Sequence, residues 1–282
     1  MAKVFNIEYY SYNEYEEAVN EAIFEYLIMP CNDNHQVLLN YSLKQSSGSE
    51  PFVSKNAYGF QTFRIRPKSM FNEFWFIMTA KVERFDDPIL NKSTFSAEEQ
   101  LMEVNSFDFH LDNYLYFQRT PLTMLTEEHQ RNIFLYDKSM TLQDFYSGLS
   151  EFIHNNIVYK PKTTTVETTA DEVIKAKKGV CQDFVHLFIA IARLQGFPCR
   201  YVSGYLEQAT KLHGSSTMHA WVEAFVPGEG WVGYDPVNNI KINTSYIKVA
   251  HGKDYMDCSP LKGVLYSKGN NRTSHHVKVA QQ

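Results

Sequence analysis

No two cysteines in this 282-residue chain have the spacing of a zinc site or of a redox pair. The four cysteines are scattered along the chain at Cys31, Cys181, Cys199 and Cys258. This spacing is poor for a disulfide framework and poor for a tetrahedral zinc site. The sequence therefore predicts no bound metal ion and no cofactor.

Long apolar runs and an excess of positive charge are also lacking. No apolar run reaches the roughly 18 residues that a membrane-spanning helix needs. The formal net charge is -5 and the pI is about 6.1, which argues against a nucleic-acid or polybasic membrane surface. Residues 1–10 contain no apolar segment typical of a signal peptide, so the expected location is cytoplasmic.

What is abundant is hydrophobic and aromatic residues, at 44% and 15%, a composition typical of a globular protein. The first 85 residues alternate apolar and polar positions in short segments, which predicts strands of a small β-sandwich. These segments are residues 3–12, 35–45, 60–67 and 74–85. Residues 15–30 fit a helix by their Glu and Ala content, but they also alternate, so a strand is the other interpretation.

The hydrophobic period becomes helical from about residue 95. Helices are predicted over residues 96–104, 141–157, 168–179 and 181–194. Ser96 and Thr141 are candidate N-caps, Thr169 and Glu172 form a capping box, and Gly179 suits a C-terminal cap. Strands follow at residues 199–207, 218–227, 231–235 and 275–281. The expected fold class is α+β, with a β-sandwich domain at residues 1–90 and a second domain at residues 91–282.

Cys181 is the first candidate for chemistry because it stands at the start of a long apolar helix. The unpaired N–H groups and the positive dipole at a helix N-terminus favour an anion, and a thiolate is one. Gly179, just before it, would allow a tight turn that exposes the sulfur. A cysteine beside a core helix is also often a simple packing residue, so position alone leaves both interpretations open.

His219 and Asp235 supply a possible base and its orienting carboxylate. His219 begins one strand-like segment, Asp235 ends the next, and a Gly-rich turn joins the two. Such a carboxylate can hold one ring nitrogen and leave the other facing the thiol. Residues opposite each other in an antiparallel hairpin have numbers with a constant sum, and side chains alternate between the two faces. The numbers 219 and 235 have an even sum, so the two side chains share a face only if the constant sum is also even. This requires a loop of odd length, or a bulge in a loop of even length. A hydrogen-bonded sheet histidine and a turn aspartate before proline are the simpler readings of each residue alone.

The combined pattern resembles a known family. The segments "GVCQDFVHLFIAIARLQGFPCRYVSGYL", "SSTMHAWVEAFVPGEGWVGYDPVNN" and "SYIKVAHGKDYMDCSPLKGVLYSKG" are similar to bacterial transglutaminase-like proteins, many of which are described as cysteine proteases. The first 85 or so residues resemble that family's N-terminal β region. The resemblance implies a papain-like α+β catalytic domain with Cys181, His219 and Asp235 as a triad. Lys253 stands where the family usually has arginine, but no triad residue is replaced.

Other residues near the pattern are candidates to line the site or to stabilise an oxyanion. These candidates are Gln182, Tyr159 and Trp221, beside the backbone N–H of Cys181 as the first oxyanion donor. Trp221 shares a strand face with His219, and it fits a roof over the triad as well as a core position. His186 and Asp183 are interpreted as structural, and His213 as part of a solvated loop.

Three functions are consistent with these residues. The first is hydrolysis of a peptide or amide bond through a thioester on Cys181, with His219 as the proton shuttle. The second is a transglutaminase reaction, in which an amine resolves the same thioester. The third is a non-enzymatic binding module with a relic catalytic domain. The expected partner is a protein or peptide substrate, with no nucleic acid and no membrane, and the oligomeric state does not follow from the sequence.

Overall fold

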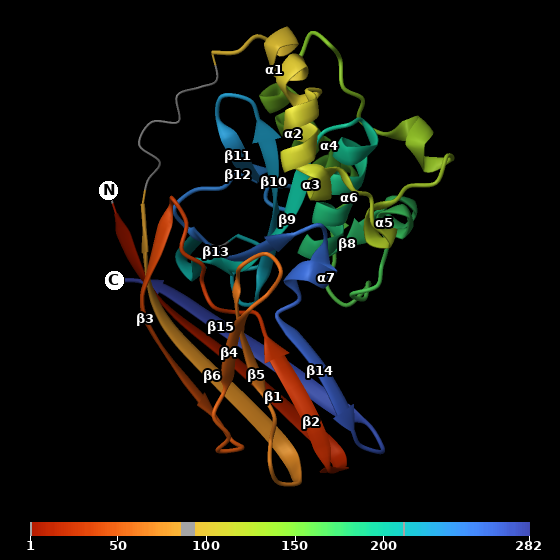
Figure 1. Ribbon diagram of the computed structural model, residues 1–282. Coiled ribbons are helices and arrows are strands. Elements are labelled where there is room, and N and C mark those ends of the chain that lie inside the picture. The colour runs from red at the N-terminus through yellow and green to blue at the C-terminus, as the bar shows by residue number, and fades with distance from the viewer. Residues whose placement is uncertain (1, 86–93, 211) are drawn as a thin grey trace.

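The alternating segments near the N-terminus form strands of two antiparallel sheets, seen in the lower half of the computed structural model (Figure 1). Residues 2–85, 94–210 and 212–282 are described. The first sheet has the order β15-β1-β6-β3 and the second the order β14-β2-β5-β4. The strands from the first 85 residues are β1 (Lys3–Val19), β2 (Glu21–Tyr26), β3 (Gln36–Gln45), β4 (Phe52–Lys55), β5 (Gln61–Ile65) and β6 (Phe71–Arg84).

The two sheets face each other through aromatic side chains. Phe24 of β2 stacks on Phe74 of β6 with ring centroids 4.4 Å apart, and Tyr26 stacks on Phe76 at 4.2 Å. All four side chains are almost fully buried. Residues 15–30 fitted either a helix or a strand. In the structure they are strand up to Val19 and again in β2, because their alternating apolar residues face the space between the sheets.

Both ends of the chain build this sandwich. The C-terminal strands β14 (Leu261–Tyr266) and β15 (Asn271–Gln281) pair with β2 and β1. The ladder of β15 with β1 runs from Phe5 opposite Gln281 to Tyr15 opposite Asn271. The expected boundaries, residues 1–90 and 91–282, therefore do not describe the C-terminal end, where residues 261–281 lie in the sandwich. The alternation of residues 275–281 predicted a strand, but it could not identify a partner strand more than 250 positions away.

The upper half contains a five-stranded antiparallel sheet with the order β12-β11-β10-β9-β13 and the helices that cover it (Figure 1). Its strands are β9 (Cys199–Leu206), β10 (His219–Val226), β11 (Gly230–Asp235), β12 (Ile240–Lys241) and β13 (Tyr246–Gly252). Two short strands, β7 (Val158–Tyr159) and β8 (Lys178–Gly179), pair in parallel as a separate two-stranded sheet. The observed fold is therefore mixed α+β, as predicted.

Three of the helices begin where the predicted caps placed them. They are α1 (Ala97–Val104), α2 (Phe107–Asp112), α3 (Tyr114–Phe117), α4 (Leu142–Asn156), α5 (Ala170–Ala176), α6 (Cys181–Leu194) and α7 (Tyr255–Cys258), with 3-10 turns at Pro121–Thr123, His129–Asn132 and Gln208–Thr210. Ser96, Thr141 and Thr169 cap α1, α4 and α5 through their side chains. The C-cap of α5 is not Gly179 but Lys177, whose φ is 51°.

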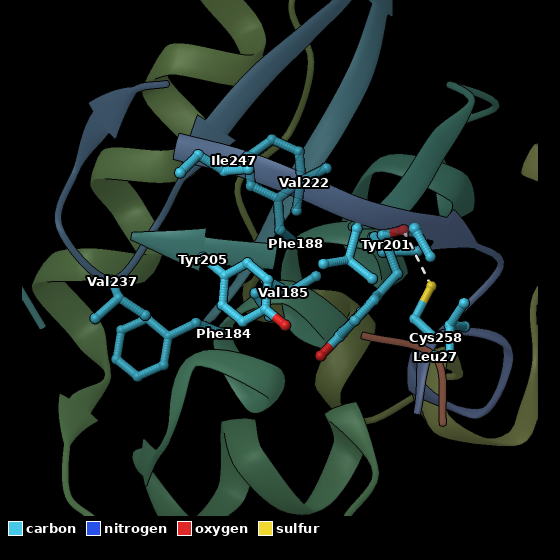
Figure 2. Close-up of a cluster of buried hydrophobic side chains, with 14 of the residues drawn as sticks. Leu27, Phe184, Val185, Phe188, Tyr201, Tyr205, Val222, Val237, Ile247 and Cys258 are labelled. Atoms are coloured by element: carbon cyan, nitrogen blue, oxygen red, sulfur yellow. Dashed lines mark hydrogen bonds between the residues drawn. The ribbon is translucent and has the colours of Figure 1, made fainter. Parts of the chain in front are cut away.

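Helix α6 lies in the upper half and is buried from Gln182 to Arg193 (Figure 1). Figure 2 shows Phe184, Val185 and Phe188 of α6 among side chains from the five-stranded sheet. Leu27, which follows β2 of the sandwich, belongs to the same buried cluster. The cores of the sandwich and of the upper half are thus continuous, and the helix start is held on a rigid scaffold.

Candidate active site

Cys181 is the first residue of α6, as the sequence predicted. Its side chain is partly exposed, whereas the twelve residues that follow it are buried. The helix start is fixed by Asp183, whose Oδ2 accepts the Val180 N–H at 2.6 Å and the Thr164 hydroxyl at 2.7 Å. The N–H of a residue in this first position has no intrahelical acceptor, so it is available to an incoming group.

Gly179 is required here for a reason other than the expected helix cap. A Cβ atom on Gly179 would lie 2.6 Å from both Cβ and Oδ2 of Asp183. The small residue therefore lets the capping carboxylate approach the backbone closely. Gly179 is also paired with Tyr159 across the short parallel strands, which brings Tyr159 to the start of α6.

His219 and Asp235 meet on one face of the β10–β11 hairpin. The hairpin ladder ends with Val226 opposite Gly230, so three residues, 227–229, form the loop. This odd length confirms the prediction for side chains that share a face. Nε2 of His219 lies 2.8 Å from Oδ2 of Asp235, and both side chains are 0% exposed.

The carboxylate of Asp235 accepts four further hydrogen bonds. Its Oδ2 accepts the Tyr246 hydroxyl and the Asn238 Nδ2, each at 2.7 Å. Its Oδ1 accepts the backbone N–H groups of Val237 at 3.0 Å and of Asn238 at 3.2 Å. Burial by itself would raise the pKa of Asp235, but the His219 charge and these hydrogen bonds lower it below the usual value. Asp235 is therefore held as an anion.

The pKa of His219 changes in the opposite direction from that of Asp235. Burial would lower the pKa of His219, but the charge and hydrogen bond of Asp235, with a contribution from Cys181, raise the pKa to about 10. The second ring nitrogen, Nδ1, is buried and has no hydrogen-bond partner within the described part of the chain. The interaction of Cys181 with the imidazole, which adds to the rise in the pKa of His219, places the thiol beside the ring.

The three further candidates from the sequence have different environments. Tyr159 is partly exposed and packs against His213, with ring centroids 4.6 Å apart. Its pKa is raised by burial and by the charges of Cys181 and Asp235, which places it near the site. The Gln182 amide is engaged elsewhere, since its Nε2 donates to the carbonyl oxygen of Val166 at 3.1 Å.

Trp221 is a packing residue and not a roof over the thiol. It belongs to a small buried cluster with Val202, Leu206 and Tyr246, and its ring meets that of Tyr246 edge-on at 5.4 Å. Trp221 packs against Tyr246, and the Tyr246 hydroxyl donates to Asp235, so Trp221 helps to position the donor to this carboxylate. The alternation of side chains along the strand correctly placed Trp221 on the same face as His219. It did not show that the Trp221 side chain packs in a buried cluster and not over the thiol.

The sequence reasoning missed Tyr246 and Asn238 as partners of Asp235. Asn238 offered a local signal, because an Asn three residues after the Asp of an Asp-Pro pair is typical of a turn with side-chain hydrogen bonds. Tyr246 offered no such signal, since β13 lies beside β9 and not beside β11. Only the tertiary fold brings its hydroxyl to the carboxylate.

His186 and Asp183 are engaged in structural contacts. His186 is fully buried in α6, and its Nε2 accepts the Tyr255 N–H at 3.2 Å. Burial lowers the pKa of His186 to about 3, so the ring is neutral. Within residues 2–85, 94–210 and 212–282, no group of three or more His, Cys, Asp or Glu side chains is arranged to hold a metal ion. Over the same residues, no helix is long and apolar enough to cross a membrane.

Comparison with known proteins places this site in a family context. Residues 135–236 match the family model of the transglutaminase-like superfamily, and this range contains the cysteine, the histidine and the aspartate. An uncharacterized protein of Mycobacterium tuberculosis is 36% identical over 139 residues, which is 46% of this chain and 44% of that protein. An uncharacterized protein of Mycobacterium leprae is 30% identical over 187 residues, or 65% of this chain and 64% of that one. The chain thus covers less than two thirds of the length of these relatives.

A solved structure is similar over the whole chain. The proposed cysteine protease of Cytophaga hutchinsonii superposes with a TM-score of 0.80 at 22% sequence identity, covering 100% of this chain and 91% of that one. At this identity the likeness establishes a shared fold, which includes the β-sandwich. These comparisons confirm the resemblance to transglutaminase-like proteins found in the sequence. They also confirm the predicted fold class, an α+β chain with a transglutaminase-like core.

Proposed function

We propose that this chain, which contains a transglutaminase-like domain over residues 135–236, is a cysteine-dependent acyl-transfer enzyme that hydrolyses peptide or amide bonds. Cys181 is the nucleophile, His219 the proton shuttle and Asp235 the group that orients it. The observation that carries the proposal is the buried 2.8 Å contact of His219 Nε2 with Asp235, beside Cys181, a partly exposed cysteine at a helix N-terminus that interacts with the same imidazole. The name of the Cytophaga hutchinsonii protein supports the same class of activity.

The first half-reaction forms a thioester. The Cys181 sulfur attacks the carbonyl carbon of the acyl donor, and the π electrons of the C=O bond move onto the carbonyl oxygen. The protonated imidazole of His219 then gives its proton to the leaving amine as the C–N bond breaks. Asp235 keeps its charge throughout and stabilises the imidazolium. In the second half-reaction water attacks the thioester carbon and His219 takes the water proton. The C–S bond then breaks, the carboxylic acid leaves, and the Cys181 thiolate is restored beside the protonated imidazole.

The oxyanion needs at least one positioned donor. The backbone N–H of Cys181 is the first donor, because it has no acceptor within its helix. Tyr159 is the better of the two side-chain candidates for the second, since Gly179 holds it in the short ladder beside the cysteine. Gln182 would first have to release the Val166 carbonyl.

An amine could resolve the same thioester, which would make the enzyme a transglutaminase. The triad serves both reactions, so the reaction products must separate them. A second alternative, a binding module with a relic domain, is less well supported, because the buried carboxylate of Asp235 is fixed by five hydrogen bonds, one of them to His219.

A peptide library incubated with the protein, with and without an excess of a fluorescent primary alkylamine, tests the proposal. Cys181→Ala is the matched control because it removes only the sulfur. Release of free carboxylic acid by the wild type alone supports hydrolysis, and covalent incorporation of the amine supports transfer. Products that are identical for wild type and Cys181→Ala would contradict both reactions.

The partner and the location remain part of this proposal. A protein or peptide is the proposed substrate, because the reaction needs an amide carbonyl. The cytoplasm is the proposed location, and fractionation of cells that produce the protein would test it.

A further inference from the structure

The ring nitrogen of His219 that does not contact Asp235, Nδ1, is covered by a loop of the chain. We define the covering loop as residues 212–218, the segment that leads into β10. A Cβ atom on Gly214 would lie 2.1 Å from Nδ1 of His219 and 2.9 Å from Cγ and Cε1. The φ of Gly214 is +95°, a conformation that favours glycine. The backbone of the covering loop is therefore packed directly on the imidazole, which explains why this side chain is 0% exposed.

Asn238 ties the covering loop to the carboxylate that orients the histidine. Its Oδ1 accepts the backbone N–H of His213 at 3.0 Å, and its Nδ2 donates to the His213 carbonyl oxygen at 3.2 Å. The same Nδ2 donates to Oδ2 of Asp235 at 2.7 Å. One amide thus contacts both the loop above the imidazole and the oxygen that holds the imidazole from the other side.

Two further contacts hold the covering loop at its flanks. The ring of His213 packs against Tyr159 beside the start of α6. The carbonyl oxygen of Ser216 accepts the N–H of Val277, at 3.3 Å, from strand β15 of the sandwich. Neither contact touches Asp235, whereas the hydrogen bonds of Asn238 join the covering loop to this carboxylate.

We propose that Asn238 is a positioning residue that couples the covering loop to the His219–Asp235 pair. With the loop in place, the amide bridges His213 and Asp235 and water is kept from the imidazole. When the loop moves to admit an acyl donor, the two bonds to His213 break, while the bond to Asp235 keeps the pair oriented. This inference rests on the proposed function of the triad, but the coupling itself can be measured without a substrate.

Hydrogen–deuterium exchange of the wild type and of Asn238→Ala tests the coupling. The backbone amides of residues 213–217 should exchange about 10-fold faster or more in Asn238→Ala, as expected from the loss of two hydrogen bonds. The ring Nε2 proton of His219, followed by NMR, should also exchange faster, because the loop no longer seals the ring. Coupling is reciprocal, so Asp235→Asn should speed exchange in the covering loop as well.

The matched control is Asn239→Gly, which removes the adjacent exposed asparagine at φ 50°, where glycine is unstrained. Its exchange in the loop should equal that of the wild type. If Asn238→Ala fails to fold, Gly214→Ala serves as the second variant, because the added Cβ pushes the loop off the imidazole while Asn238 remains. Loop and ring exchange unchanged in Asn238→Ala, or loop exchange unchanged in Asp235→Asn, would overturn the proposal. Failure of the proposed function would instead show as an unreactive Cys181 in the wild type, whatever the exchange rates are.

Discussion

Nε2 of His219 lies 2.8 Å from Oδ2 of Asp235 although the two residues are not direct partners in the hairpin. The ladder pairs Val222 with Tyr234, and its continuation sets Asp235 opposite Trp221. The contact is therefore diagonal and made by the side chains. It depends on the donors that fix the carboxylate, Tyr246 and Asn238, as much as on the strand register.

The first prediction ranks three substitutions. Cys181→Ala should abolish single-turnover acylation, and His219→Ala should reduce it nearly as far. Asp235→Asn should cost less, roughly 10- to 10³-fold, because a thiolate–imidazolium pair is already ionised and does not need the carboxylate to take a proton. All three variants should fold, as melting curves would show. An Asp235→Asn protein that is folded and as inactive as Cys181→Ala would contradict the preformed ion pair.

The second prediction concerns stability and pH. In a Cys181→Ala background, which removes the thiol, Asp235 still holds the pKa of His219 above its unfolded value of about 6.5. The folded chain then carries a proton that the unfolded chain has lost, so this stabilisation is complete below about pH 6.5 and decreases as pH rises toward the folded pKa. The slope should reach about 1.4 kcal/mol per pH unit.

Urea unfolding of Cys181→Ala and Cys181→Ala/Asp235→Asn at several pH values between 6.5 and 10 would measure that slope. The double variant should lack it, because the histidine has lost its anionic partner. Parallel stability curves for the two proteins over this range would show that Asp235 does not raise the pKa of His219.

The third prediction separates a site hydroxyl from a structural one. Tyr246→Phe removes a donor to Asp235, and Tyr205→Phe removes a buried hydrogen bond of 2.6 Å to the carbonyl oxygen of Ile28. Tyr205→Phe should lower the free energy of unfolding by about 1 kcal/mol, and Tyr246→Phe by about 1.5–3 kcal/mol, because the acceptor of the Tyr246 hydroxyl is charged. Only Tyr246→Phe should slow acylation, by about 10-fold, as expected when a charged group loses a hydrogen bond. Equal acylation rates in the two variants would remove Tyr246 from the site.

The fourth prediction tests the role of the C-terminal strand. Val277 of β15 is fully buried in the sandwich, whereas its neighbour Lys278 is exposed. Val277→Asp should destabilise the protein by about 3 kcal/mol or more, because it buries an unpaired charge. Lys278→Asp should change the stability by less than about 0.5 kcal/mol. Similar melting temperatures for the two variants would mean that β15 is not part of the core.

Local patterns predicted much of this structure, and contacts distant in sequence account for the rest. Ser96, Thr141 and Thr169 marked helix starts correctly because capping is a local interaction. The parity argument for His219 and Asp235 also succeeded, since a hairpin is local. The sandwich position of residues 261–281 and the Tyr246 hydroxyl could not be predicted, because β-sheet partners are chosen by packing across the whole fold.

Gly179 shows how a correct residue can be assigned for the wrong reason. It stands where the sequence suggested a helix cap and a tight turn, but Lys177 takes the cap in the left-handed conformation. Gly179 is needed instead because Asp183 packs against its backbone. Composition and spacing identify such a glycine, but only the three-dimensional structure shows which neighbour excludes a side chain.

The central claim is that His219 activates Cys181, and alkylation of the native protein tests it most directly. The wild type and His219→Ala would be treated with iodoacetamide at pH 6, and the modified cysteines would be identified by peptide mass spectrometry. Cys181 should be alkylated rapidly in the wild type, while Cys31, Cys199 and Cys258 stay largely unmodified, because burial raises the pKa of each of these three thiols. His219→Ala should lose most of the Cys181 reactivity at this pH. A Cys181 that reacts no faster than the other cysteines, or equally fast without the histidine, would contradict the account.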